Sequence, residues 1–126
     1  MPEKRIEFGK QAEKTAAEFL KANGYKILQC NYRNKFGEID IIAQDKGTIC
    51  FVEVKARHSL NLGFPEEAVF SKKQSRICKV AIYYLKANNL LEHLSRFDVL
   101  TLLYTDDLPK ISLIKDAFEL NVNFTL

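Results

Sequence analysis

The first half of the chain contains two alternating segments, Gly37–Ile42 and Phe51–Arg57, that carry charged residues where buried strands would carry apolar ones. Both segments are rich in β-branched and aromatic residues, which is typical of β-strands. The residues between them, Asp45–Thr48, include a glycine and predict a hairpin turn. We therefore expect an antiparallel ribbon, and its charged positions constrain how it can pack.

A turn of even length sets the register of this ribbon. On one face Asp40 lies opposite Glu53 and Glu38 lies opposite Lys55, which predicts three carboxylates and one ammonium close together at one end. The other face is predicted to be apolar and buried, with these facing pairs: Ile39 and Val54, Ile41 and Val52, and Ala43 and Cys50.

The crowded carboxylates predict a cation site. Like charges across a ribbon are destabilising, and half-buried carboxylates are costly unless something compensates them. Oxygen ligands of this kind suit Mg²⁺ or Mn²⁺. The alternative is a solvated face with an ion pair between Glu38 and Lys55, although Ile42 and Phe51 on the same face indicate that it is partly covered.

The spacing of Asp40 from Glu53-Val54-Lys55 resembles the PD-(D/E)XK nuclease superfamily, with Ile39 in place of the proline in the superfamily's name. A longer pattern resembles the YraN-like family of uncharacterised bacterial proteins, whose fold is related to archaeal Holliday-junction resolvases. The resemblance extends from about Gly9 to about Val99. It rests on three runs: Asn31–Arg33, Gly37–Asp40 and Phe51–Arg57.

The order of predicted elements fits an α/β fold, a restriction-endonuclease-like sandwich with a mixed central sheet and helices on both faces. With 47% hydrophobic residues, residues 1–126 are expected to form a single endonuclease-like domain. Besides the ribbon, the expected elements are a helix over Phe8–Asn23, a strand over Tyr25–Tyr32, a helix over Ser71–Lys86, a strand over Arg96–Tyr104 and an edge strand over Lys110–Lys115.

Phosphodiester hydrolysis, which the resemblance implies, assigns roles to the charged residues. Asp40 and Glu53 would hold Mg²⁺ or Mn²⁺, with the Val54 carbonyl as a further ligand, and Lys55 would position the attacking water. Glu38 is placed to tune Lys55 or to bind a second ion.

Two helical residues are candidates for supporting the site. Glu13 lies at the edge of the apolar stripe of the first helix, whereas Glu7 and Glu18 point away from it. Junction resolvases carry a first-helix glutamate at the metal site, so the resemblance implies that Glu13 is a ligand. Gln74 lies within an apolar helix face, where its amide either reaches the carboxylates or bonds nearby backbone.

The second predicted helix carries a basic stripe with one tyrosine. This stripe is either a solvated face or a surface that contacts nucleic acid at the flank of the site. The net charge of +3 is too small to decide between them. The stripe consists of Lys72, Arg76, Lys79, Tyr83 and Lys86, and the residues best placed for phosphates at the site itself are Lys55, Arg57, Lys72 and Lys73.

Several other features are predicted to be structural. Three widely spaced cysteines indicate small buried residues in a reducing compartment rather than disulfides or a zinc site. His58 and His93 are expected on the surface, and Arg96 and Asp98 either support the site or pair by chance at a strand end. Neither a signal peptide nor a membrane span is predicted, so a cytoplasmic location is expected.

The expected activity is therefore a small metal-dependent DNA nuclease, with branched or junction DNA as the substrate that the resemblance implies. RNA as the substrate stays open. The alternative is a non-catalytic nucleic-acid-binding or scaffolding domain that retains the fold. A symmetric junction has two strands to cut, so a homodimer is also expected.

Overall fold

The computed structural model describes residues 2–58, 71–105 and 108–118, with side chains for 7–58, 74–105 and 108–117. A mixed sheet has the strand order β1-β2-β3-β4-β5, in which β3 and β4 are parallel and all other neighbours are antiparallel. The elements in chain order are α1 (Pro2–Ala22), β1 (Lys26–Asn34), β2 (Gly37–Asp45), β3 (Thr48–Arg57), α2 (Ser71–Ala87), β4 (Ser95–Leu103) and β5 (Lys110–Phe118).

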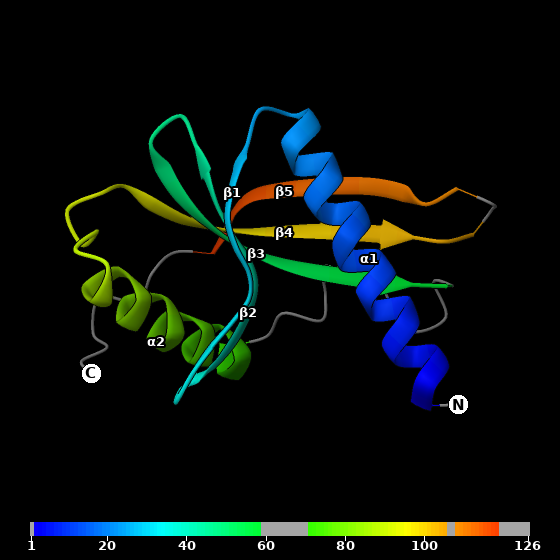
Figure 1. The fold of residues 1–126 in the computed structure, drawn as a ribbon, viewed down its shortest axis with the longest axis horizontal. Coiled ribbons are helices and arrows are strands. Elements are labelled where there is room, and N and C mark those ends of the chain that lie inside the picture. The colour runs from blue at the N-terminus through cyan, green and yellow to red at the C-terminus, as the bar shows by residue number, and fades with distance from the viewer. Residues whose placement is uncertain (1, 59–70, 106–107, 119–126) are drawn as a thin grey trace.

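The two helices cover opposite faces of the sheet (Figure 1). Helix α1 packs Ala12, Ala16 and Leu20 on a core that includes Val52 of β3, while α2 packs on a separate core around Phe51. This arrangement confirms the predicted restriction-endonuclease-like α/β sandwich. The predicted edge strand is also confirmed, since β5 pairs with β4 alone.

The predicted turn between β2 and β3 is confirmed. Asp45 pairs with Thr48, and the two turn residues between them, Lys46 and Gly47, have φ angles of 50° and 89°. Positive φ at both central positions defines a type I′ turn, whose twist matches that of the flanking strands. Glycine adopts this conformation at little cost, so the sequence signal and the observed geometry agree.

The predicted register holds over the first part of the ribbon. The pairs run from Asp45–Thr48 to Ile41–Val52, where the β2–β3 ladder ends. The expected continuation of the ladder to Asp40 with Glu53 and Glu38 with Lys55 is therefore wrong.

The prediction of a single apolar face is also wrong at one residue, Ile39. Ile41 and Ala43 pack in the core beneath α1, but Ile39 packs in the core beneath α2. Residues two apart in a strand normally share a face, so the alternation breaks between Ile39 and Ile41.

The break in β2 has a counterpart in β1. Cys30 pairs with Ile41 and Tyr32 pairs with Ile39, and the residue between them, Asn31, has a φ of 53°. Asparagine is one of the few residues other than glycine that enters the left-handed region readily. In both strands, therefore, the side of the sheet to which alternate side chains point changes beside Asp40.

The cysteine prediction is correct for two residues and wrong for one. Cys50 and Cys78 are buried, whereas Cys30 is exposed because β1 is an edge strand. Burial raises the pKa of the Cys50 thiol to about 12. None of the helices in the described ranges is long and apolar enough to cross a membrane.

Thiol reactivity should follow this difference in exposure. We expect Ellman's reagent to modify one thiol rapidly in the folded protein and three after denaturation, because buried thiols are shielded from the reagent. Cys30→Ser should abolish the rapid phase, and Cys78→Ser should leave it intact. Rapid reaction of two or more thiols in the native protein would contradict the described packing.

Candidate active site

Asp40 occupies the point where the β2–β3 ladder ends. Its carboxylate replaces the next backbone pair, because Oδ2 accepts a hydrogen bond of 2.8 Å from the Val54 N–H. This bond fixes the orientation of a half-buried carboxylate between two diverging strands. A side-chain acceptor at this position also satisfies a backbone donor that would otherwise lack its ladder partner.

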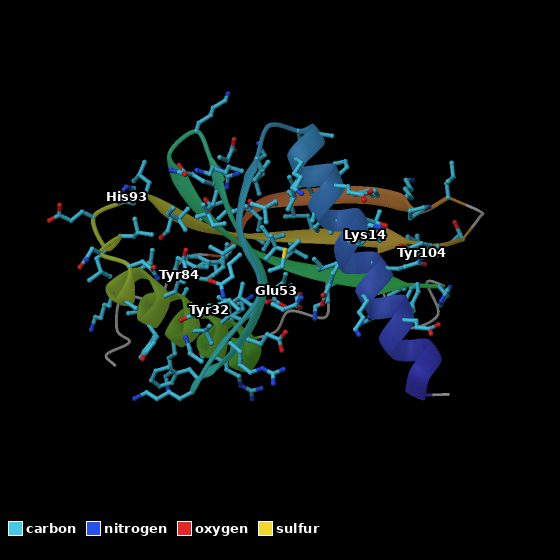
Figure 2. The ribbon with its side chains drawn as sticks, in the orientation of Figure 1. Lys14, Tyr32, Glu53, Tyr84, His93 and Tyr104 are labelled. Carbon is cyan, nitrogen blue, oxygen red and sulfur yellow. The ribbon has the colours of Figure 1, made fainter. Side chains whose placement is uncertain are left out.

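Glu53 is the first residue of β3 beyond its last pair with β2, and the residue is only 5% exposed. Figure 2 shows it near the middle of the molecule, where β2 crosses β3. The alternation of β3 places it on the same side of the sheet as Phe51, facing the core beneath α2. A carboxylate this deeply buried is costly unless its charge is compensated.

Lys55 and Val54 complete the predicted segment of β3. Lys55 is half-buried and lies two residues beyond Glu53, so both point to the same side of the strand. The Val54 side chain packs toward the core beneath α1. Its N–H points at Asp40, and the N–H and C=O of one strand residue point the same way, so the Val54 carbonyl also faces β2.

Glu13 faces the sheet, as its position in the helix predicts. It is half-buried, while Glu7 and Glu18 are exposed. Burial raises the pKa of the Glu13 carboxyl, the charges of Asp40 and Glu38 raise that pKa further, and a hydrogen bond with Asn31 lowers it. Glu13 therefore lies within electrostatic reach of Asp40.

Asn31 is the site residue that sequence reasoning missed. It produces the break in β1 and also hydrogen-bonds to Glu13, so it links the first helix to the strand pair that carries Asp40. An asparagine inside an otherwise alternating strand is the signal that could have indicated it, because asparagine is depleted in strands and tolerates a positive φ.

Glu38 pairs with a cation of the neighbouring strand β1. Its Oε2 atom lies 2.8 Å from Nη2 of Arg33 in β1, and the two side chains form an ion pair. Within the described ranges, no three or more His, Cys, Asp or Glu side chains form a group that could hold a metal ion. The predicted gathering of Glu38, Asp40 and Glu53 into one group is therefore not found there.

The remaining donors still suit a hard cation. Asp40 and Glu53 supply carboxylate oxygens on adjoining strands, and Val54 supplies a carbonyl oxygen facing the same side as its N–H. Mg²⁺ is usually bound by one or two carboxylates together with water and substrate phosphate. Two carboxylates and one carbonyl fit that pattern, whereas Glu13, Asp40 and Glu53 together form no such group of three within the described ranges.

The other predicted residues belong to α2 and to the end of β3. Gln74 and Lys79 of α2 are half-buried, and Arg76 is exposed with its aliphatic part against Gly37. Arg57, at the end of β3, donates to the Ala56 carbonyl. Lys72 and Lys73 belong to the first turn of α2, but their side chains lie outside those described.

The two histidines lie on the surface, as predicted. Both are exposed. His58 stacks on Phe8 with ring centroids 4.3 Å apart, and Tyr104 lies beside both rings. His93 lies in the connection before β4, where its N–H donates to the Leu90 carbonyl.

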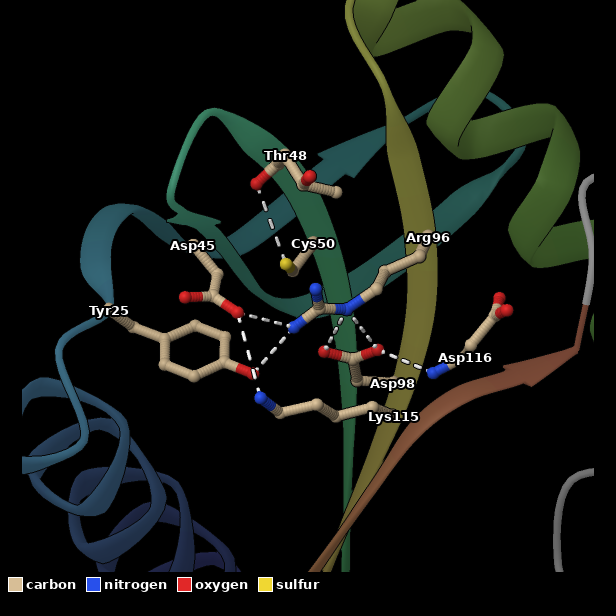
Figure 3. Close-up of polar contacts among 8 residues, drawn as sticks. All are labelled: Tyr25, Asp45, Thr48, Cys50, Arg96, Asp98, Lys115 and Asp116. Atoms are coloured by element: carbon tan, nitrogen blue, oxygen red, sulfur yellow. Dashed lines mark hydrogen bonds and ion pairs between the residues drawn. The ribbon is translucent and has the colours of Figure 1, made fainter.

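Arg96 and Asp98 form the centre of a second polar cluster (Figure 3). The Arg96 Nε atom lies 3.0 Å from Asp98 Oδ1, and its Nη2 atom donates to Asp45 and to the Tyr25 hydroxyl. Asp98 is completely buried and also accepts from the Asp116 N–H at 2.9 Å. The cluster joins β2, β4, β5 and the start of β1.

This Arg96 cluster is structural rather than part of the candidate site. Asp45 lies five residues from Asp40 along β2, which corresponds to about 17 Å at about 3.3 Å per residue. Asp98 lies opposite Val52, the neighbour of Glu53, but the alternation of β4 turns its side chain to the side of the sheet opposite Phe97. Its pairing with Arg96 is therefore no accident of a strand end, and the cluster ties β4 to β2 and β5 on the side that α1 covers.

Known proteins resemble this chain over most of its length. A model of the uncharacterised protein family UPF0102 matches residues 12–102, which include Glu13, Asp40, Glu53 and Lys55. A UPF0102 protein of Syntrophus aciditrophicus is 50% identical over 112 residues, covering 89% of this chain and 88% of the relative. A UPF0102 protein of Desulfosudis oleivorans is 42% identical over 122 residues, covering 97% and 98%.

Removing Arg96 should destabilise the fold strongly. Arg96→Met leaves the buried Asp98 carboxylate without its cation, and breaking a buried pair typically costs about 3–5 kcal/mol of unfolding free energy. Urea denaturation followed by circular dichroism measures this cost. The matched control is Arg33→Met, whose exposed pair with Glu38 should contribute little to the unfolding free energy. Equal losses in the two variants would contradict the structural role.

Glu13→Gln should stabilise the metal-free protein at neutral pH. The folded-state pKa of Glu13 is raised, so its ionised form opposes folding above that pKa, and the opposition disappears as the pH falls and the carboxyl is protonated. We expect a higher melting temperature than wild type at pH 7 and none of this gain near pH 3. Glu18→Gln, at an exposed position, should change little at either pH.

Proposed function

The chain belongs to the uncharacterised protein family UPF0102, and we propose that it is a Mg²⁺- or Mn²⁺-dependent nuclease that hydrolyses phosphodiester bonds in DNA. One observation carries this proposal. The Val54 N–H orients the Asp40 carboxylate beside the strand that carries buried Glu53. Two carboxylates at the end of a ladder support the proposal, because a divalent ion held between them would bind a substrate phosphate.

The residues divide the chemistry between them. Asp40 and Glu53 would hold the divalent ion, with the Val54 carbonyl and Glu13 as further oxygen donors. Such an ion supplies polarisation of the phosphoryl oxygen and makes hydroxide available near neutral pH. Lys55, half-buried on the same strand face as Glu53, positions the attacking water and offsets the negative charge that develops on the phosphate.

Basic residues near the strand and helix ends would hold the DNA backbone. Arg57 ends β3, and Arg76 and Lys79 lie on α2. Lys72 and Lys73, in the first helical turn, belong to the same proposed set. Contacts of this kind position a substrate without reading its sequence.

Branched or junction DNA is the substrate that we favour, because of the resemblance to Holliday-junction resolvases. Cutting a symmetric junction requires two sites, so a homodimer is part of the proposal. The competing reading is a non-catalytic nucleic-acid-binding or scaffolding domain, which retains the fold without the reaction.

Substitutions at Lys55 and Asp40 should impair cleavage and metal binding differently. Lys55→Ala should bind Mg²⁺ and DNA nearly as wild type does yet cleave at least about 100-fold more slowly, because its interaction exists mainly in the transition state. Asp40→Asn should lose both cleavage and the rise in melting temperature that millimolar Mg²⁺ produces in wild type. The assay is cleavage of single-stranded, duplex, flap and four-way-junction DNA with Mg²⁺ or Mn²⁺.

Lys110→Ala, an exposed position on β5, is the matched control and should retain wild-type cleavage. A wild-type protein that binds DNA but cleaves none of the substrates would favour the scaffolding reading. Wild-type cleavage by Lys55→Ala would remove the catalytic assignment of that lysine.

A further inference from the structure

A hollow lies where the turn between β1 and β2 meets the outer surface of α2. Its volume is about 360 Å³, and it is lined by Lys35, Phe36, Tyr83, Lys86 and Ala87. The lining combines two aromatic rings with two lysines and contains no acidic side chain. This composition differs from that of the candidate active site, which is rich in carboxylates.

Contacts to α2 hold the turn in place. The Asn34 side chain donates to the Val80 carbonyl at 3.2 Å, and its Oδ1 atom accepts from the Phe36 N–H at 2.9 Å. Gly37 lies so close to the helix that a Cβ atom there would be 3.3 Å from side-chain atoms of Arg76 and Val80. The Phe36 ring is therefore presented by a turn that is tied to the helix.

Tyr83 is accessible, Phe36 is half-buried against the core beneath α2, and two lysines line the hollow beside them. Phe36 and Tyr83 have ring centroids 6.1 Å apart at an angle of 60°, and Tyr83 is 39% exposed. The Lys35 ammonium lies 5.2 Å from the centroid of the Phe36 ring, and Lys86 is exposed at the opposite rim. An accessible aromatic ring beside a second ring and among cations is a usual platform for unpaired nucleobases.

We propose that this hollow binds an unpaired nucleotide of a DNA strand, with the base against Phe36 and Tyr83 and the phosphate held by Lys35 and Lys86. A base has an aromatic face that stacks on these rings regardless of sequence. The lining includes no acidic side chain that could pair with the two lysines. The phosphate would supply that negative charge.

This inference rests on the proposed function for its substrate and makes that substrate more specific. Phe36 precedes Asp40 by four residues, which is about 13 Å at about 3.3 Å per residue. That distance corresponds to roughly four steps of 3.4 Å along a strand of duplex DNA. The hollow would therefore select DNA that has an unpaired nucleotide a few positions from the bond to be cut.

Binding measured without metal tests the inference separately from cleavage. Fluorescence anisotropy with labelled oligothymidylate in EDTA should give about tenfold weaker binding for Tyr83→Leu and for Phe36→Leu than for wild type. Binding of a fully paired duplex of the same length should change less than twofold. Phe8→Leu, which alters a different aromatic cluster, is the control and should bind both DNAs as wild type does.

The lysines are tested through the salt dependence of binding. Lys86→Gln should reduce the slope of log affinity against log salt for oligothymidylate by roughly one unit, whereas Lys110→Gln should leave it unchanged. Circular dichroism of each variant confirms that the fold is retained.

Three results would overturn the inference. One is wild-type affinity for oligothymidylate in both aromatic variants, and another is an equal loss of single-stranded and duplex binding. Displacement of the oligonucleotide by poly-glutamate at equal charge would also overturn it, because the hollow would then be a site for acidic peptides. If the protein binds oligothymidylate through the hollow but cleaves no DNA, this inference is supported and the proposed nuclease activity is rejected.

Discussion

The hydrogen bond from the Val54 N–H to the Asp40 carboxylate is the interaction on which the arrangement of the site depends. It ends the β2–β3 ladder, after which β2 continues beside β1 and β3 continues beside β4. A gap between diverging strands would leave backbone groups unsatisfied. The side chain of Asp40 satisfies one of them and is held in place by doing so.

The two faces of the sheet contribute differently to this point. Helix α1 covers one face and directs Glu13 toward Asp40, while α2 and the core around Phe51 enclose the side of β3 that carries Glu53. The site thus lies where two cores meet at the edge of a ladder. The Arg96 cluster differs from the candidate site, because Arg96 pairs with both Asp45 and Asp98 and the Lys115 ammonium lies 3.7 Å from Asp45.

Sequence patterns predicted the elements and part of their pairing. The hairpin turn followed from Gly47, and the pairs from Asp45–Thr48 to Ile41–Val52 followed from the turn, because side-chain period and turn length determine register. The orientation of Glu13 followed from helical periodicity. These predictions succeeded because each depends on residues close together in the sequence.

The chain's sequence by itself therefore determined its helices, its strands, its register near the turn and the residue types available at the site. Only the tertiary structure decided that Ile39 and Ile41 face different cores and that Arg96 joins Asp45, Asp98 and Tyr25. These outcomes depend on a left-handed Asn31 and on contacts between residues far apart in the chain, which local periodicity does not encode.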